Sequence, residues 1–247
     1  MPSRPYFDTI EVKGGGDPTS AARAVIQVGE YDHAWNLQVE DEILKRLEES
    51  GKGRAIFTPA GDIEFIFLNL TDTWPDVDGE RSNPRTRHFA FSDPAVRQAM
   101  ALLIDRKSME QYIYGRAGVA TANWINEPAR YRSPNTKWAF DPERAAQMLD
   151  AAGWKRAGGG LREKDGRKMK FVFQSSVNST RQKAQAIIKS ACQKIGIELE
   201  LKAITASVFF SSDVANPDTN TKFIADFQMY GAVGSSPDPL LGLARFV

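Results

Sequence analysis

Residues 223–240 read FIADFQMYGAVGSSPDPL, and this stretch changes character at its midpoint. Its first half, residues 223–230, is a short apolar run rich in aromatics, which predicts a strand buried on both faces, as in a parallel sheet. In its second half, two glycines loosen the backbone and two prolines remove hydrogen-bond donors that a sheet would need. We therefore expect the strand to end in a loop after Tyr230.

This loop is a candidate binding site because open α/β sheets bind ligands at the ends of their strands. It offers backbone N–H groups and hydroxyls at little steric cost, from Gly231, Gly234, Ser235 and Ser236. Gly, Ser and Pro also occur in ordinary turns, so a tight turn that binds nothing remains the alternative.

Composition favours an ordinary soluble globular protein of one or two domains. The chain has 247 residues, of which 42% are hydrophobic and 26% charged. Its formal charge of +1 gives no reason to expect nucleic acid or an anionic membrane as the main partner. A single cysteine, Cys192, excludes an internal disulfide, and two distant histidines, His33 and His88, leave little for a metal site. We therefore expect no metal and no cofactor.

Hydrophobic periodicity and capping residues predict alternating helices and strands. A hairpin turn is expected at Asp165 and Gly166. Strand 170–174, helix 180–195 and strand 197–203 should form a right-handed βαβ unit. Other strands are expected over 8–13 and 63–70. Other helices are expected from Asp17 to Gly29, over 40–50, from Ser92–Asp93 through Leu103, over 108–115 and from Asp141 to Gly153.

Two further segments have open interpretations. Residues 73–92 lack periodicity and are expected to form a long surface loop. Its basic residues either bind an anion or form a solvated face; they are Arg81, Arg85, Arg87 and His88. Gly14–Gly16 precede a helix as a phosphate-binding loop does, but the lysine and hydroxyl of a P-loop are absent and the GxGxxG spacing is not met.

No local catalytic signature is present. The sequence has no GxSxG elbow, no HExxH helix and no cysteine near a histidine, so no catalytic residue is assigned. Catalytic groups are assembled in space, so a nucleotide-using α/β enzyme stays open as an alternative function. A stand-alone interaction module is a third possibility and would require a large apolar patch or an oligomer.

Several segments, taken in order, resemble the family 5 extracellular solute-binding proteins, which serve peptide, nickel and opine ABC importers. The resemblance is carried by VGEYDHAW, IEFIFLNLTD, FSDPAVRQAMALLIDRKSM, FDPERAAQMLDAAGW, the stretch around Lys194–Gly196, and the loop from Asp226 to Pro239. These segments span nearly all of the chain.

The resemblance implies an α/β fold of the periplasmic-binding-protein type (type II, cluster C), with a mixed sheet flanked by helices. Residues 1–66 would be the last part of the first lobe up to the hinge, and residues 67–247 most of the second lobe. Family members are usually about twice this long, and the chain starts without an apolar signal region and ends on an apolar run, so we expect a fragment.

The function that the resemblance implies is capture of a small solute or peptide between two lobes, followed by delivery to the transmembrane subunits of an ABC permease. Such a protein would be a monomer in the periplasm or outside the cell, with no nucleic-acid partner and no catalysis. The implied ligand-binding residues are Tyr230, Gly231, Val233, Ser235 and Ser236 in the loop, Asn69 and Thr71 at the hinge, and Trp35 and Asn36 across the cleft. Phe209 and Phe210 are further candidates. Each of these residues could instead be structural.

The loop departs from that of the family's peptide-binding members. They carry a Trp at the position of Ala232 and an Asp, which neutralises the peptide's amino terminus, at the position of Ser235. A charge-assisted contact to an ammonium contributes about 1.5–3 kcal/mol. Its loss predicts a ligand held by neutral hydrogen bonds and aromatic stacking, such as a modified peptide, an opine-like compound or a sugar conjugate.

Overall fold

The computed structural model describes residues 6–14, 16–58, 61–156, 158–232, 238 and 240–243. Contacts between Cα atoms divide the chain into two compact units, Met1–Ile56 and Phe57–Val247. None of the helices in these described ranges combines the length and the apolar character that a bilayer crossing requires. The assignment of residues 1–66 and 67–247 to two lobes stays a prediction.

The first unit is helical. It contains α1 (Pro18–Ala22), the π-helix η1 (Arg23–Val28) and α2 (Asp41–Glu49). The predicted start and end of the first helix are confirmed, because the Asp17 carboxylate accepts the N–H groups of Thr19 and Ser20, and Gly29 ends η1 at φ 70°.

The predicted strand over residues 8–13 is wrong. These residues form no strand, and Ile10 and Val12 are 76% and 86% exposed. Alternating sequence makes a strand only where a neighbour completes the hydrogen-bond ladder, and the described residues supply none here.

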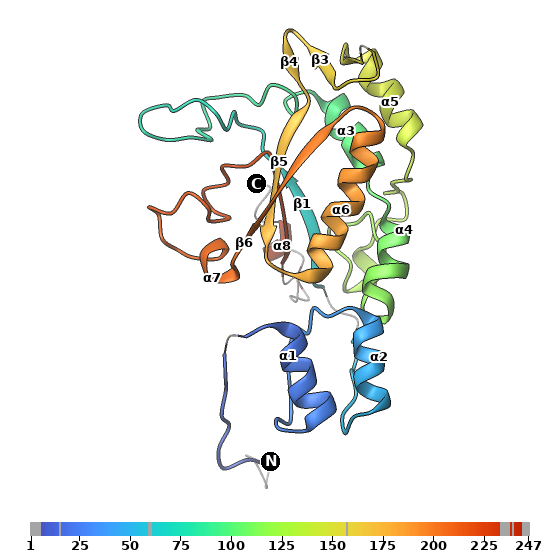
Figure 1. The fold of residues 1–247 in the computed structure, drawn as a ribbon, viewed down its shortest axis with the longest axis vertical. Helices are drawn as coiled ribbons and strands as arrows, with labels where there is room; N and C mark the ends of the chain where they lie inside the picture. The colour runs from blue at the N-terminus through green and yellow to red at the C-terminus, as the bar shows by residue number, and fades with distance from the viewer. Residues whose placement is uncertain are drawn as a thin grey trace. The chain divides into compact units, whose positions relative to one another are not determined.

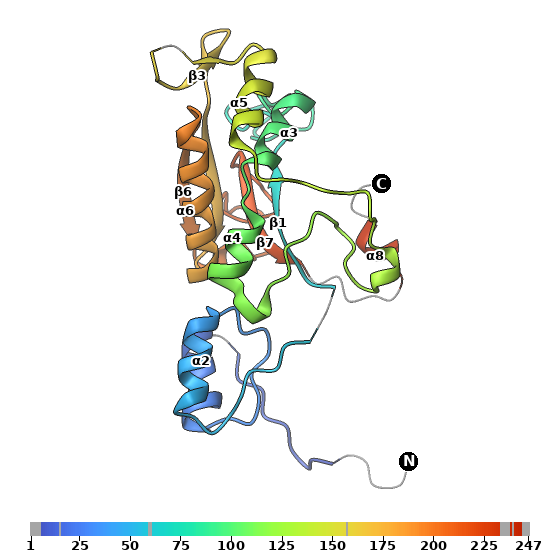
Figure 2. The ribbon, with the colours of Figure 1, turned by 90° about the vertical axis from the view of Figure 1, so that its right-hand side faces the viewer.

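The second unit is built on a mixed four-stranded sheet in the order β1-β7-β5-β6, whose strands are labelled between Figures 1 and 2. Its strands are β1 (Ile63–Leu68), β5 (Lys170–Ser176), β6 (Glu198–Ile204) and β7 (Phe227–Ala232). Strand β5 pairs in parallel with β6 and β7, whereas β1 pairs antiparallel with β7. The predicted βαβ unit is confirmed as β5, α6 (Ser179–Lys194) and β6.

Helices cover one face of this sheet. Figures 1 and 2 both place α3 (Pro94–Leu102), α4 (Arg106–Met109) and α6 on that side. The buried core lies between these helices and the strands, and it includes Phe91, Leu103, Phe171, Phe173, Ile188 and Leu199. The other face lies toward α7 (Ala206–Phe209), visible at the left of Figure 1.

The second unit contains five further helical elements among its described residues. They are η2 (Glu110–Tyr114), η3 (Gly115–Ala117), η4 (Ala129–Tyr131), α5 (Pro142–Ala151) and α8 (Leu240–Leu243). A second, three-stranded sheet contains β2 (Lys155–Arg156), β3 (Arg162–Lys164) and β4 (Arg167–Lys168). Asp165 and Gly166 form its predicted hairpin turn, with φ of 51° and 72°.

The end of the chain differs from the prediction at both boundaries of its strand. Strand β7 begins at Phe227 and not at Phe223, whose φ of 45° is left-handed and incompatible with a strand. It also continues through Gly231 and Ala232, which were expected in the loop. These two residues pair with Glu64 and Ile63, so the neighbouring strand supplies the ladder that glycine alone does not favour.

Candidate functional site

Aromatic rings gather around Tyr230 at the exit of β7. The Tyr230 ring lies 4.8 Å from Phe65 and 5.8 Å from Phe67, measured between centroids, because β1 pairs Phe65 directly opposite Tyr230. The rings of Phe209 and Phe210 lie 5.9 and 6.1 Å from Tyr230. We call these five residues, together with Trp124, whose ring is 4.9 Å from Phe65, the aromatic cluster.

The cluster is only partly closed to solvent. Phe209 is fully buried, Phe210 is 49% exposed, and Tyr230 and Trp124 are half-buried. Such rings can stack against a ligand while their edges pack on the protein, and binding sites for small molecules are typically lined in this way. Of the predicted site residues, Tyr230 and the outside candidates Phe209 and Phe210 are therefore brought together.

Gly231 lies beside a largely buried ion pair. Its partner across the sheet is Glu64, whose Oε1 lies 2.7 Å from Arg181 Nε. Arg181 Nη1 also donates to Ser176 Oγ at 2.6 Å, and the Arg181 side chain is 5% exposed. Burial raises the pKa of Glu64, and the Arg181 charge opposes this shift. The carboxylate in register with Gly231 is thus already compensated within the protein.

Tyr114 lies near this ion pair. Among the described residues, the Tyr114 hydroxyl is the one buried side-chain polar atom with no hydrogen-bond partner. Burial raises its pKa, and the nearby Glu64 charge raises it further. The hydroxyl therefore stays protonated.

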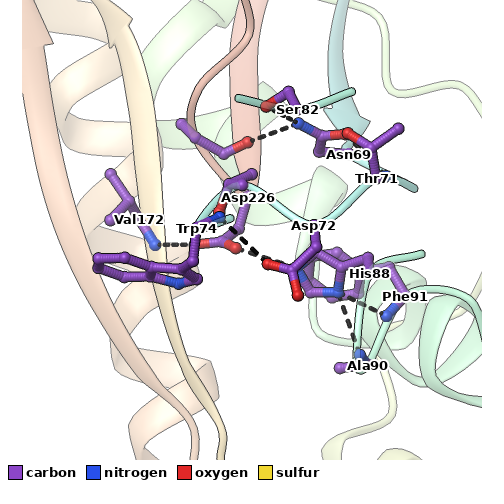
Figure 3. A network of polar contacts seen from close by, with 12 residues as sticks. Asn69, Thr71, Asp72, Trp74, Ser82, His88, Ala90, Phe91, Val172 and Asp226 are labelled. Atoms are coloured by element: carbon purple, nitrogen blue, oxygen red, sulfur yellow. Dashed lines mark hydrogen bonds and ion pairs between the residues drawn. The ribbon is translucent and has the colours of Figure 1, made fainter. Parts of the chain in front are cut away.

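Asn69 and Thr71 belong to a different network (Figure 3). Asn69 Nδ2 donates to the carbonyls of Phe223 and Ala225 at 2.7 and 3.2 Å. Asn69 Oδ1 accepts the Thr71 N–H at 3.0 Å and the Thr71 hydroxyl at 2.6 Å. The amide therefore ties the end of β1 to the segment that leads into β7.

The structure does not bring Asn69 and Thr71 together with Tyr230 and Gly231. Because β1 and β7 are antiparallel, the end of β1 at Leu68 faces the start of β7 at Phe227. Figure 2 shows the two strands side by side. The two pairs of candidate residues lie at opposite ends of the same ladder.

Sequence analysis missed the role of His88. Its ring is 1% exposed, and its Nε2 lies 2.9 Å from Asp226 Oδ1 (Figure 3). Its Nδ1 accepts the N–H groups of Ala90 and Phe91 at 3.1 and 2.9 Å, which assigns the proton to Nε2. Asp226 Oδ2 in turn accepts the Val172 N–H at 2.6 Å.

Neither interpretation of the basic segment fits His88, which is buried rather than solvated or anion-binding. Arg81 and Arg85 are engaged nearby. Arg81 Nε donates to the Thr73 carbonyl at 2.7 Å, and Arg85 pairs with Asp78. An aspartate next to a strand was the one signal in the sequence that could have suggested a buried partner for the histidine.

The structure does not place the other predicted site residues relative to these networks. Trp35, 72% exposed, and Asn36, at φ 56°, belong to the first unit, which is described by itself. Val233, Ser235 and Ser236 lie outside the described residues.

The model of the bacterial extracellular solute-binding proteins, family 5 (Middle), matches residues 1–247. The chain belongs to this family. Its members are binding proteins of ABC importers. The family match confirms the resemblance, and the observed mixed sheet flanked by helices confirms the expected α/β class.

Two relatives illustrate the sequence similarity. The chain is 28% identical to the oligopeptide-binding protein AppA of Bacillus subtilis over 209 residues, which cover 81% of this chain and 34% of AppA. It is 38% identical to the oligopeptide-binding protein OppA of Mycobacterium bovis over 131 residues, 50% of this chain and 22% of OppA. This family 5 chain thus spans about a third of the length of AppA.

Solved structures agree in fold. AppA from Bacillus subtilis in complex with a nonapeptide matches 91% of this chain and 41% of AppA, with 22% identity and a TM-score of 0.60. NikA from Brucella suis in complex with Fe(III)-EDTA matches 90% of this chain and 41% of NikA, with 22% identity and a TM-score of 0.64.

Proposed function

We propose that this family 5 chain is part of the substrate-binding component of an ABC importer. It captures a peptide-like or opine-like small solute between two lobes and delivers it to the transmembrane subunits of the permease. Family membership across residues 1–247 carries the proposal. The half-open aromatic cluster at the end of β7 supports it, because such a surface suits a small guest.

The proposed contact residues are Tyr230 and Gly231, followed by Val233, Ser235 and Ser236, with Trp35 and Asn36 on the opposite wall. Asn69 and Thr71 take a supporting role at the hinge, since their polar groups are engaged with one another and with backbone carbonyls. Residues 1–66 and 67–247 belong to the two lobes in this proposal.

The solute is recognised without a charge-assisted contact to an ammonium. Ser235 stands where peptide-binding members carry an aspartate, and the carboxylate of Glu64 beside Gly231 is paired with Arg181. A buried ammonium without a counter-charge would lose its hydration, and no electrostatic attraction would offset that cost. The proposed ligand is therefore a modified peptide, an opine-like compound or a sugar conjugate.

Closure of the lobes provides the mechanism. Binding shifts the protein toward a closed form, and this form docks on the permease. No bond is made or broken, so the protein acts as a binding protein and not as an enzyme. It works as a monomer in the periplasm or outside the cell and has no nucleic-acid partner.

Calorimetric titration of the full-length protein with free di- and tripeptides tests the ligand class. Weak or absent binding is expected for free peptides, together with micromolar or tighter binding for a solute without a free ammonium. Micromolar binding to ordinary free peptides would reject the ligand class. Failure of every small solute would reject the binding function itself.

No observation on the described residues favours the alternative functions. At the glycine-rich segment, the Asp17 carboxylate already accepts the N–H groups of Thr19 and Ser20, which are the donors a phosphate would need. A thermal-shift screen with ATP and NAD checks the nucleotide alternative, and light scattering checks an oligomeric interaction module.

A further inference from the structure

A pair of buried amides adjoins the aromatic cluster. Gln174 on β5 and Gln228 on β7 are direct neighbours in the parallel ladder and are 2% and 3% exposed. Gln174 Nε2 donates to Gln228 Oε1 at 3.2 Å. Two glutamines side by side within a sheet are therefore bonded to each other.

This single bond leaves hydrogen-bonding capacity unused. Two primary amides carry two carbonyl oxygens and four N–H groups, and the bond between them engages one oxygen and one N–H. No described residue bonds the Gln174 oxygen or the Gln228 nitrogen. Turning both amides over would exchange the roles of the two residues but would still leave one acceptor and one donor nitrogen.

The unused groups retain contact with solvent. Within the described part of the chain, the Tyr114 hydroxyl alone is both fully buried and unpartnered. The unused amide atoms therefore remain accessible to solvent, although their side chains are almost completely buried. Buried polar side chains are normally satisfied, so a partner from outside the protein is the natural complement.

The amides face the aromatic cluster. Gln228 and Tyr230 are two residues apart on one strand, so their side chains leave the same face of the sheet. Phe67 is the direct partner of Gln228 on β1, and its ring lies 5.8 Å from that of Tyr230. The amide pair thus lies where the aromatic side chains of two neighbouring strands meet.

The surroundings of the pair favour a neutral guest. On the other side of Gln174, the next residue in register is Lys202, whose ammonium lies 2.5 Å from Asp218 Oδ1. This neighbouring cation is therefore compensated by a carboxylate of the protein and is not a free counter-charge for an anionic ligand group.

We propose that Gln174 and Gln228 form the polar floor of a subsite that binds a neutral amide group of the solute, such as a peptide bond or a carboxamide, between aromatic rings. One amide donor and one amide acceptor match the acceptor and donor that a single peptide group presents. This inference rests on the proposed binding function and specifies its ligand chemistry.

The test uses the full-length protein and two probes, N-acetyl-Ala-Phe-Ala-amide and its analogue with one internal amide replaced by an ester. Calorimetry should show binding of the amide probe and binding of the ester that is weaker by about three- to tenfold, because one N–H is lost. This comparison needs no variant. Equal affinity for the two probes, or no binding of the amide probe, would overturn the inference.

Variants locate the subsite. Gln228→Met and Gln174→Met should each weaken the amide probe by about three- to tenfold and remove the difference between the probes. Gln185→Met is the matched control, because Gln185 is 1% exposed and bonds the Phe173 carbonyl from α6 on the opposite side of the sheet. It should leave affinity within about twofold. Folding of each variant is checked by thermal unfolding.

The outcomes separate the two proposals. If the wild type binds the amide probe and both glutamine variants bind it unchanged, the subsite is wrong while the binding function stands. If the wild type binds an opine or a sugar conjugate but not the amide probe, the same conclusion follows. If it binds no solute of any class, the proposed function fails.

Discussion

His88 and Asp226, 138 residues apart in the chain, form a buried hydrogen bond of 2.9 Å that joins the long loop over residues 73–92 to the start of β7. The imidazole is also stacked on Phe91, with ring centroids 4.2 Å apart. Each polar atom of the histidine ring and both carboxylate oxygens of Asp226 have a partner. This network fixes the position from which β7 runs toward the aromatic cluster.

His88→Ala should destabilise the second unit by about 2–4 kcal/mol, because it leaves buried Asp226 and two N–H groups unsatisfied and opens a cavity. Urea unfolding followed by circular dichroism measures the loss. His33→Ala, at an exposed position, is the control and should change stability by less than about 0.5 kcal/mol. A His88 variant as stable as the wild type would show that the network contributes little.

Arg181→Met should cost about 3 kcal/mol at pH 7, since it leaves the largely buried Glu64 carboxylate, whose side chain is 21% exposed, without its partner. Burial already raises the pKa of Glu64, and losing Arg181 raises it further. A raised carboxyl pKa means that the folded form gains relative stability as the pH falls, so the deficit should shrink as the pH falls through the raised pKa of Glu64 and be smallest below the unfolded-state value of about 4.3. Unfolding midpoints from pH 4 to 8 measure this.

The double variant Glu64→Gln with Arg181→Met provides the control for the ion pair. It should recover most of the loss at pH 7, because no buried charge remains. A double variant as unstable as Arg181→Met alone would assign the loss to packing rather than to charge.

Asp150→Asn should weaken the link between α5 and β3. Arg162 Nη1 lies 2.6 Å from Asp150 Oδ1, and this hydrogen bond lowers the pKa of Asp150. A lowered carboxyl pKa stabilises the fold above the unfolded-state value, and the contribution is lost as the pH falls below about 4. Because Asp150 is half exposed, the expected cost at pH 7 is under about 1 kcal/mol. Denaturation at pH 7 and pH 3 tests this, with exposed Glu163→Gln as control.

Gly51→Ala should disrupt the first unit. An added Cβ would lie 2.2 Å from the Ile26 carbonyl oxygen and 2.4 Å from that of Leu47, so the backbone of η1 or α2 must move. The expected cost exceeds about 2 kcal/mol, by analogy with overpacked cores. Gly14→Ala is the control, because nothing lies within 4 Å of its added Cβ. Hydrogen exchange of α2 amides in both variants measures the effect, and equal exchange would contradict it.

Sequence reasoning succeeded where the signal is local. Asp93 and Asp141 cap the helices they were expected to cap, and Gly196 takes the left-handed conformation that ends α6. A capping side chain bonds N–H groups two or three residues away, so a short window contains the whole interaction. The same holds for the hairpin turn at Asp165.

Sequence reasoning failed where the decisive partner is remote. Gly231 lies in a strand because Glu64, far upstream, supplies its ladder partner. Asn69 was expected at the hinge of the same binding site as the loop after β7, and its position at the other end of the β1–β7 ladder follows from a strand direction that the sequence does not show. Local hydrophobic periodicity predicts neither the order nor the direction of strands in a sheet. It does not predict the bond between the remote residues His88 and Asp226 either.

Native mass spectrometry of the full-length protein with an equimolar pool of free tripeptides, N-acetylated tripeptide amides, an opine and a sugar conjugate tests the central claim most directly. We predict one bound solute per protein, without a free ammonium, that is released with unchanged mass on denaturation. Exchanging Tyr230 for Ala should lower its occupancy about tenfold, as expected for loss of a stacking ring. No bound solute from the pool, or release of a chemically altered one, would contradict the account.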